Sequence, residues 1–256
     1  MSNFYVPERA MFIYAHPDDV EFSGSGTAAR WTQAGSDVIY VVITDGNVGT
    51  HEKGMTATRI AEIRRAEQEA AARVAGVQTC VFLGYHDGLL QPTLELRKDL
   101  VRLIREHRPN VVVCGDPSVY FPNNSRINHP DHRAAATAAI DATFPAAEMP
   151  LLYPELEADG LSPHKVNYVY ISNWEEANYY VDISETIDLK IEALRQHESQ
   201  FDDWDPEEPI KEWAAKIGEK VGFEYAEAFR RITLEAVDEE DDGDEENGPA
   251  AEEKEA

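Results

Sequence analysis

Two short segments of the sequence combine histidine and aspartate side chains at spacings that suit a metal ion. Residues 15–21 read AHPDDVE, and residues 128–132 read NHPDH. Imidazole and carboxylate groups are ligands that suit zinc, and a catalytic zinc keeps three protein ligands and a water. His16 and Asp19, three residues apart, could both turn toward one ion, and His132 could complete the triad. These residues predict a metal site.

The remaining acidic and imidazole groups of the two segments fit an amide hydrolysis. Asp18 would lie beside the ion rather than on it, where a carboxylate can act as a general base. Zinc lowers the pKa of its water to about 7, which makes hydroxide attack feasible near neutrality. His129 could stabilise an oxyanion or donate a proton to the leaving nitrogen. Asp131 could orient His129 through a hydrogen bond.

Each segment alone also has a purely structural interpretation. His-Pro-Asp is a common turn, and Asp18 or Asp19 could cap the helix that follows. Asp131 could be an acidic residue that the helix macrodipole favours at an N-terminus. Ligands of open α/β sheets bind at the carboxyl ends of the strands, and both segments follow a predicted strand. Their convergence at one sheet edge favours the metal site.

Strand-like and helix-like segments alternate through the first two thirds of the chain. We expect strands at residues 11–15, 37–44, 77–83, 111–114, 166–172 and 179–183. We expect helices at residues 24–34, 57–75, 94–107, 130–142, 186–200 and 210–231. Such alternation predicts parallel pairing through right-handed crossovers. The expected fold is therefore a Rossmann-like three-layer α/β/α sandwich with a mostly parallel sheet.

Length and charge limit the domain organisation and the partners. The chain has 256 residues, 43% of them hydrophobic, and a net charge of -26. We expect a single domain over residues 1–235 and a disordered acidic tail over residues 236–256. Such a surface should repel nucleic acid and anionic membranes. No run of eighteen apolar residues and no secretory signal occur, so we expect a cytoplasmic protein.

The pair of motifs resembles those of the PIG-L/LmbE-like deacetylases, which remove acetyl groups from N-acetylglucosamine-containing molecules. AHPDDVEFSGSGT at residues 15–27 is similar to the strand-end motif of that family, in the form found in bacillithiol-pathway deacetylases. HPDH at residues 129–132 is similar to the second motif. The resemblance implies a hydrolase that removes an N-acetyl group from a small amino-sugar substrate. It also implies homo-oligomers, which are common among relatives.

The resemblance assigns roles to particular residues of this chain. One zinc ion would be bound by His16, Asp19 and His132. The catalytic positions would be the general base Asp18, the oxyanion or acid histidine His129, and its orienting partner Asp131. Substrate contacts would come from Arg64 and Asp87.

The substrate contacts have alternative interpretations, as do the other histidines and the cysteines. Arg64 could be a solvated helix arginine paired with a glutamate, and Asp87 could be a turn residue before a glycine. Four histidines outside the two motifs are interpreted as ordinary surface residues: His51, His107, His164 and His197. Cys80 and Cys114 lie in apolar strand-like runs and are expected to be buried core residues.

Three other functions are alternatives to the deacetylase interpretation. An amidase of a thiol conjugate, or a hydrolase of another acyl group, would have the same metal site. A non-catalytic binding module would be expected to have lost a catalytic residue, whereas every expected position is filled. A nucleotide-binding dehydrogenase is disfavoured, because residues 24–26 do not form a G-x-G-x-x-G fingerprint and follow two aspartates.

Overall fold

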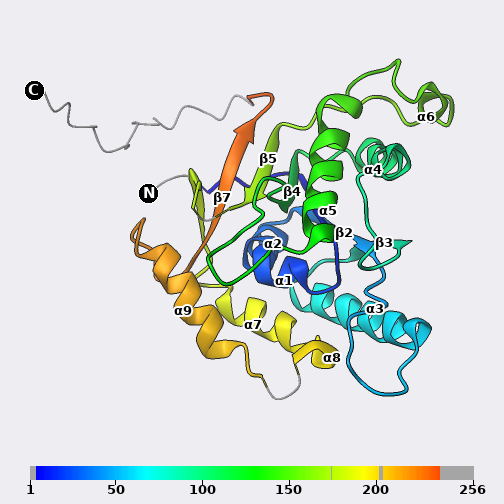
Figure 1. Cartoon of the computed structure of the whole chain (residues 1–256). Coiled ribbons are helices and arrows are strands. Elements are labelled where there is room, and N and C mark those ends of the chain that lie inside the picture. The colour runs from blue at the N-terminus through cyan, green and yellow to red at the C-terminus, as the bar shows by residue number, and fades with distance from the viewer. Residues whose placement is uncertain (1–3, 174, 202–203, 237–256) are drawn as a thin grey trace, which may run out of the picture.

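Seven strands form one mixed sheet within residues 4–173, 175–201 and 204–236, the part of the chain that the computed structural model describes. The strands are β1 (Arg9–Tyr14), β2 (Asp37–Thr44), β3 (Thr79–Tyr85), β4 (Val111–Gly115), β5 (Tyr168–Ser172), β6 (Tyr179–Asp182) and β7 (Ala226–Thr233). Their spatial order is β3-β2-β1-β4-β5-β7-β6 (Figure 1). Neighbours from β3 to β5 pair parallel, and β7 pairs antiparallel with β5 and β6.

Helices cover both faces of the sheet. They are α1 (Asp19–Ser23), α2 (Ser25–Gln33), α3 (Ala57–Val74), α4 (Leu94–His107), α5 (Pro130–Asp141), the π-helix η1 (Ala142–Ala146), α6 (Pro154–Ala158), α7 (Ile187–Arg195), α8 (Glu198–Phe201) and α9 (Glu207–Gly218). Buried residues of α2, α3, α7 and α9 pack on one face, and those of α4, α5 and α6 pack on the other. The predicted three-layer α/β/α sandwich with a mostly parallel sheet is confirmed.

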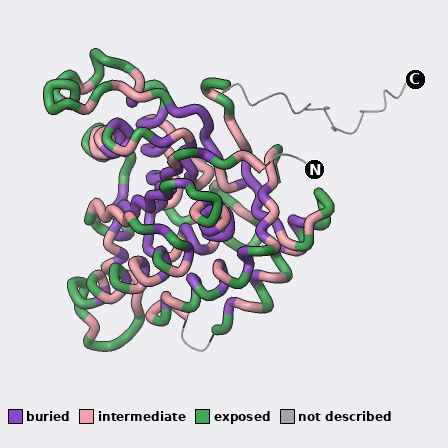
Figure 2. Tube along the Cα trace, turned by 180° about the vertical axis from the view of Figure 1, so that it is seen from behind, coloured by how far each residue is buried: buried purple, intermediate pink, exposed green. Residues whose placement is uncertain are grey.

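The central strands are apolar along their whole length because both of their faces are covered. Phe12 of β1 belongs to the core under α2, whereas its neighbours Met11 and Ile13 belong to the core under α4 and α5. Successive side chains of a strand point to opposite faces, so a strand covered on both faces needs apolar residues throughout. Figure 2 shows the resulting distribution, with buried residues inside and exposed residues along outer loops and helix faces.

The strand β7 replaces the second half of a predicted helix. The sequence pattern predicts one helix over residues 210–231, but α9 ends at Gly218 and the chain then turns at Gly222, whose φ is 80°. The following segment enters the sheet between β5 and β6 as an antiparallel strand. The prediction is wrong there because pairing with two strands outweighs the helical propensity of the Ala-Glu-Ala-Phe-Arg-Arg run.

Two glycines allow α2 to pack closely against its neighbours. A Cβ atom at Gly24 would lie 2.9 Å from Cε1 of Phe12. A Cβ atom at Gly26 would lie 3.0 Å from the side chain of Ile183. The missing side chains at these two positions therefore let α2 approach β1 and Ile183 closely. This close packing anchors the segment that follows the first motif.

The N-terminus of α2 is capped by a carboxylate from a distant strand. Its N-cap residue, Gly24, has no side chain, and Glu227 of β7 accepts hydrogen bonds from the backbone N–H of Gly26 (3.1 Å) and Thr27 (2.8 Å). Lys190 of α7 pairs with the same carboxylate at 2.7 Å. Both charged side chains are almost fully buried. Strand β7, helix α7 and the start of α2 are thus held together.

Several predictions concern the chain ends and the surface. Residues 237–256 of the predicted acidic tail lie outside the described residues, so the tail and the domain boundary stay predictions. Among the described helices, we find none with the length and apolar character needed to span a bilayer.

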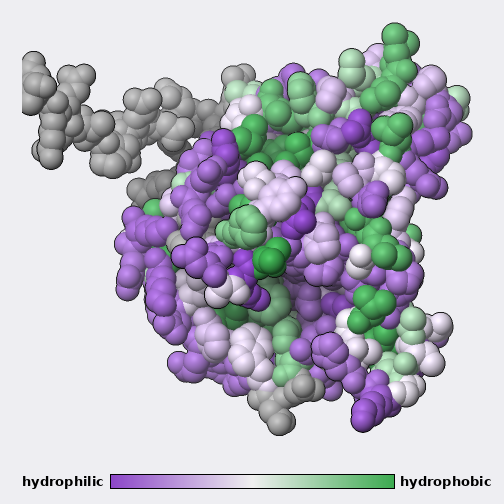
Figure 3. Space-filling view, in the orientation of Figure 1, coloured by the Kyte–Doolittle hydropathy of each residue, from purple (hydrophilic) through white to green (hydrophobic). Residues whose placement is uncertain are grey.

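Figure 3 shows a mainly hydrophilic face with separate apolar patches. The exposed apolar side chains of the loop after β4 are Tyr120, Phe121 and Ile127.

Candidate metal centre and active site

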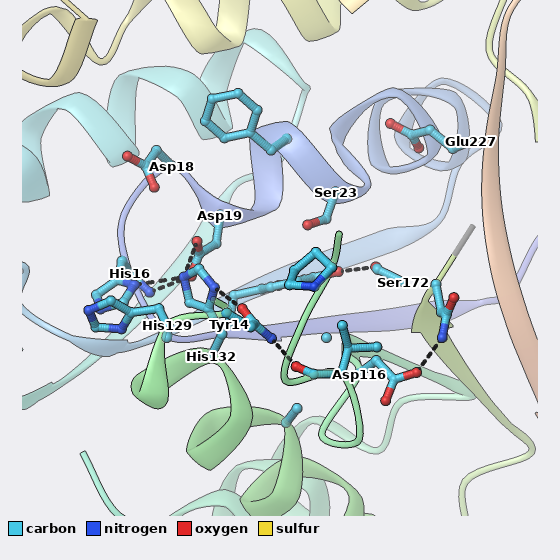
Figure 4. A pocket seen from close by; sticks show the side chains of 18 of the residues that line it. Tyr14, His16, Asp18, Asp19, Ser23, Asp116, His129, His132, Ser172 and Glu227 are labelled. Carbon is cyan, nitrogen blue, oxygen red and sulfur yellow. Dashed lines mark hydrogen bonds and ion pairs between the residues drawn. The ribbon is translucent and has the colours of Figure 1, made fainter. Parts of the chain in front are cut away.

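The two motifs meet at the carboxyl ends of β1 and β4, which are adjacent parallel strands. The first motif runs from the end of β1 into α1, and the second runs into the N-terminus of α5. Figure 4 shows His16, Asp19, His129 and His132 gathered at this edge of the sheet. The ring centroid of His16 lies 4.8 Å from that of His129 and 5.1 Å from that of His132.

The carboxylate of Asp19 lies between two imidazole rings. Its Oδ1 is 3.0 Å from Nε2 of His132, and its Oδ2 is 3.4 Å from Nδ1 of His16. Two overlapping groups also offer ligand atoms within 4.8 Å of one another: His16 with His129 and His132, and His16 with Asp87 and Asp131. The side chains at this edge can therefore hold a metal ion.

The contacts of the imidazole rings on their far sides determine which nitrogen is free. Nδ1 of His132 lies 3.1 Å from the amide Oδ1 of Asn128, an atom that can only accept. Nδ1 therefore carries the proton, and Nε2 presents a lone pair toward Asp19. Nε2 of His16 lies 2.9 Å from Oδ1 of Asp87, so a proton there would face a carboxylate and leave Nδ1 free. Both rings thus present an unprotonated nitrogen toward Asp19 when neutral.

The site stabilises positive charge at the position of the rings. Burial disfavours the imidazolium form of His16, but the carboxylates of Asp19 and Asp87 outweigh it and raise the pKa of His16 to about 10. The same environment would stabilise a divalent cation, which binds with release of the proton.

His129 has the geometry of a hydrogen-bond donor rather than a metal ligand. Its Nδ1 accepts the backbone N–H of Asp131 at 3.2 Å, which caps α5. In the neutral ring the proton is then on Nε2. Burial and the nearby charge of His16 lower the pKa of His129, which favours the neutral form. Ligation through this ring would require a change in the cap.

Asp131 is completely buried, and its carboxylate is bound to a turn. Oδ2 accepts the N–H of Gly88 at 2.7 Å, and Oδ1 accepts the N–H of Leu90 at 3.3 Å. The sequence interpretation expects this carboxylate to orient His129. In the structure the hydrogen bond to His129 comes from the backbone of Asp131, whereas its carboxylate fixes the turn that carries Asp87.

Asp18 lies beside the side chains that could hold a metal ion and not among them. Its carboxylate Oδ2 is 3.2 Å from Nη2 of Arg64. Burial raises the pKa of Asp18 to about 6, against the opposing charge of Arg64. A carboxylate with a pKa near the working pH is suited to general base catalysis.

Arg64 and Asp87 both point into the site. Arg64 is only 4% exposed, so the alternative of a solvated helix arginine is wrong. Its Nη1 lies 3.9 Å from Oδ2 of Asp87. Burial opposes ionisation of Asp87, but His16 and Arg64 hold its pKa below its usual range. Asp87 is thus more than a turn residue, because its carboxylate faces a candidate ligand.

A cavity of about 820 Å³ extends from these side chains toward α9. Close to the two motifs, the hydroxyls of Tyr14 and Ser172 line the cavity and are 2.6 Å apart (Figure 4). Farther out it is lined by Trp204 and Trp213, which are 41% and 40% exposed. The sequence interpretation missed this compartment because its members are far apart along the chain.

The structure also corrects the expectation for His197. The sequence interpretation treats it as a surface residue, but it is 0% exposed and lies 3.3 Å from Oε2 of Glu21. It stands between α7 and α8, where the predicted continuous helix over residues 186–200 is interrupted. Its partner belongs to the first motif, 176 residues away along the chain. No local pattern indicates such a contact.

Comparisons with known proteins show the family to which the chain belongs. The model of the PIG-L family, described as GlcNAc-PI de-N-acetylase, matches residues 11–143. The diacetylchitobiose deacetylase of Thermococcus kodakarensis is 35% identical over 88% of this chain and 83% of its own length. The probable N-acetyl-alpha-D-glucosaminyl L-malate deacetylase 2 of Bacillus anthracis is 27% identical over 75% of this chain and 80% of its own.

A solved structure shares the architecture over most of its length. The N,N'-diacetylchitobiose deacetylase of Pyrococcus horikoshii, in complex with an inhibitor, superposes with a TM-score of 0.82. It is 35% identical and covers 89% of this chain and 84% of that chain. The chain belongs to the PIG-L family. The predictions of this family and of a hydrolase acting on non-peptide C–N bonds are confirmed.

Proposed function

We propose that this protein hydrolyses the N-acetyl group of a short N-acetylglucosamine-containing saccharide, with one zinc ion held by His16, Asp19 and His132. One observation carries the assignment of the ligands. The carboxylate of Asp19 lies between Nδ1 of His16 and Nε2 of His132, and both nitrogens are left free by their far-side contacts. Two imidazoles and one carboxylate form a common catalytic zinc set.

Asp19 is the better third ligand than His129. The ring of His129 uses Nδ1 to cap α5 and so keeps its proton on Nε2. Asp87 and the carboxylate of Asp131 lie behind His16, where they would orient the ring, as carboxylates behind metal-bound histidines do. A zinc ion in this set would supply Lewis acidity and lower the pKa of a bound water to about 7.

The residues around this set have distinct tasks in the hydrolysis. As the oxygen of the attacking water bonds to the acetyl carbon, Asp18 accepts a proton from that water. Nε2–H of His129 donates a hydrogen bond to the carbonyl oxygen as negative charge develops there. The proton then passes to the sugar nitrogen as the C–N bond breaks, and acetate and a free amine are released. Arg64 and Asp87 hold sugar hydroxyls beside the reacting amide.

The shape of the cavity supports a substrate larger than one sugar ring. Its volume of about 820 Å³ lies in the upper part of the range for sites that enclose drug-sized ligands, about 300–1,000 Å³. The indoles of Trp204 and Trp213 offer flat apolar faces beyond the catalytic edge. Two relatives at 35% identity are named as deacetylases of diacetylchitobiose, which supports a disaccharide of this type.

We also propose a cytoplasmic enzyme that assembles as a homo-oligomer and has no nucleic acid or membrane partner. The net charge of -26 supports the last point, because such a surface repels polyanions. The oligomer rests on resemblance to the family. Light scattering of the purified protein tests it, and a monomer at all concentrations would contradict it.

The proposed reaction is tested by amine release from N-acetylglucosamine and N,N'-diacetylchitobiose. The zinc-loaded wild type should release amine and acetate in equal amounts, and faster from the disaccharide. Asp18→Asn should release almost none, whereas Asp159→Asn, the same change at the exposed residue that follows α6, should match the wild type. No release from either sugar by zinc-loaded wild type would overturn the proposal.

A further inference from the structure

The peptide bond that precedes the proposed base is held by two side chains from α3. Nη2 of Arg64 donates to the carbonyl oxygen of Pro17 at 2.7 Å. The N–H of Asp18 donates to Oε1 of Gln68 at 2.9 Å. Arg64 and Gln68 are four residues apart on the helix, so they share a face. Both polar groups of one peptide bond are therefore fixed from the same helix.

This peptide bond requires holding because of the backbone conformation of Asp18. Its φ is 96°, a value that residues other than glycine seldom adopt. Its carbonyl oxygen also accepts the N–H of Glu21 at 3.0 Å as α1 begins. A rotation of the Pro17–Asp18 peptide would therefore turn the carboxylate of Asp18 and disturb the start of α1.

Gln68 is itself oriented by a buried polar chain. Its Nε2 donates to Oε1 of Glu21 at 2.9 Å, and Oε2 of Glu21 lies 3.3 Å from Nε2 of His197. Gln68, Glu21 and His197 are each 0% exposed. An ionised carboxylate only accepts hydrogen bonds, so Glu21 must face the NH2 group of Gln68. The amide oxygen of Gln68 is thereby turned toward the N–H of Asp18.

We propose that Gln68, oriented by Glu21 and His197, is a positioning residue that sets the direction of the Asp18 carboxylate. This inference rests on the proposed function, in which Asp18 is the general base. Gln68 is not among the side chains that line the cavity, and its contact with the proposed base is the hydrogen bond from the backbone N–H of Asp18. Small misplacements of reacting groups cost large factors in rate, about 100-fold for 1 Å.

The first variant removes both hydrogen bonds of the amide and keeps its length. Gln68→Met should lower kcat for amine release by about 10- to 100-fold and leave KM and zinc content close to wild type. The backbone amide of Asp18 should exchange with deuterium faster, because its acceptor is gone. The control is Arg105→Met, which removes a buried side chain bonded to four carbonyls under the opposite face of the sheet. It should lower Tm but not kcat.

A swapped pair tests the direction of the hydrogen bonds. Gln68→Glu alone places two carboxylates at hydrogen-bonding distance and should lose as much kcat as Gln68→Met. The double variant Glu21→Gln with Gln68→Glu restores a donor facing an acceptor at each position, and it should recover most of the lost kcat. A merely space-filling role would leave all of these variants alike.

Two results would overturn the inference. One is a Gln68→Met protein with wild-type kcat and unchanged exchange of the Asp18 amide. The other is a folded double variant that is no more active than Gln68→Glu. Failure of the proposed function appears differently, as wild type that releases no amine or Asp18→Asn that keeps full activity.

Discussion

Replacing Lys190 by methionine should destabilise the fold by removing one partner of a buried ion pair. Nζ of Lys190 lies 2.7 Å from Oε1 of Glu227, and both residues are less than 5% exposed. Removing one partner of such a pair costs about 3–5 kcal/mol. Glu227 keeps its hydrogen bonds from Gly26 and Thr27 at the N-terminus of α2, so we expect about 3 kcal/mol.

Removing the acidic partner of this pair should cost more stability. Glu227→Ala leaves the buried ammonium group of Lys190 with the carbonyl oxygen of Phe22 as its one remaining hydrogen-bond partner that we observe among the described residues. It also removes the cap of α2, which is worth about 1 kcal/mol. We therefore expect a loss of about 5 kcal/mol. The double variant Lys190→Met with Glu227→Ala leaves no buried charge at this pair and should cost clearly less than the sum of the single changes.

The assay is thermal and urea unfolding of the four proteins. For a chain of this size about 1 kcal/mol corresponds to about 2–4 °C in Tm, so Lys190→Met should melt about 6–12 °C below wild type. A melting temperature within about 2 °C of wild type, or additive effects in the double variant, would refute the assignment of this pair as a structural clamp.

Three further predictions follow from the pKa shifts and contacts. Asp87→Asn should weaken zinc binding about 10- to 100-fold in a chelator competition, because the carboxylate behind His16 is lost. Burial opposes protonation of His197, but the carboxylate of Glu21 outweighs it and raises the pKa of His197. The stability that protonated His197 contributes to the fold is therefore complete below about pH 6.5 and is lost as pH rises through the raised pKa. Melting curves of wild type and His197→Gln should therefore differ most in acid and converge in alkali. Burial raises the pKa of Cys80 to about 12, so iodoacetamide should label the native protein far more slowly than the unfolded one.

The sequence predicted those parts of the structure that depend on local pattern. The β-branched run at 37–44 became β2 with the same bounds, and the helix at 94–107 became α4 with the same bounds. Both motifs follow strands, so the parallel sheet brings His16 and His132 together. Motif spacing and topology are sufficient for this level of detail.

The remaining features depend on contacts between distant segments. The local sequence pattern around Phe229 predicts a helix. The segment is a strand because it pairs with β5 on one side and β6 on the other. Glu21 and His197 meet across 176 residues, and a histidine at the end of an amphipathic helix carries no signal of burial. The carboxylate of Asp131 binds the backbone at residues 88–90, which no spacing rule predicts.

The most direct test of the central claim is a titration of metal-free protein with zinc, followed by amine release from N,N'-diacetylchitobiose. We expect no activity without metal, a linear rise to a single equivalent per chain, and no rise for Asp19→Ala or His132→Ala. Full activity in the metal-free wild type, or full zinc-dependent activity in Asp19→Ala, would contradict this claim.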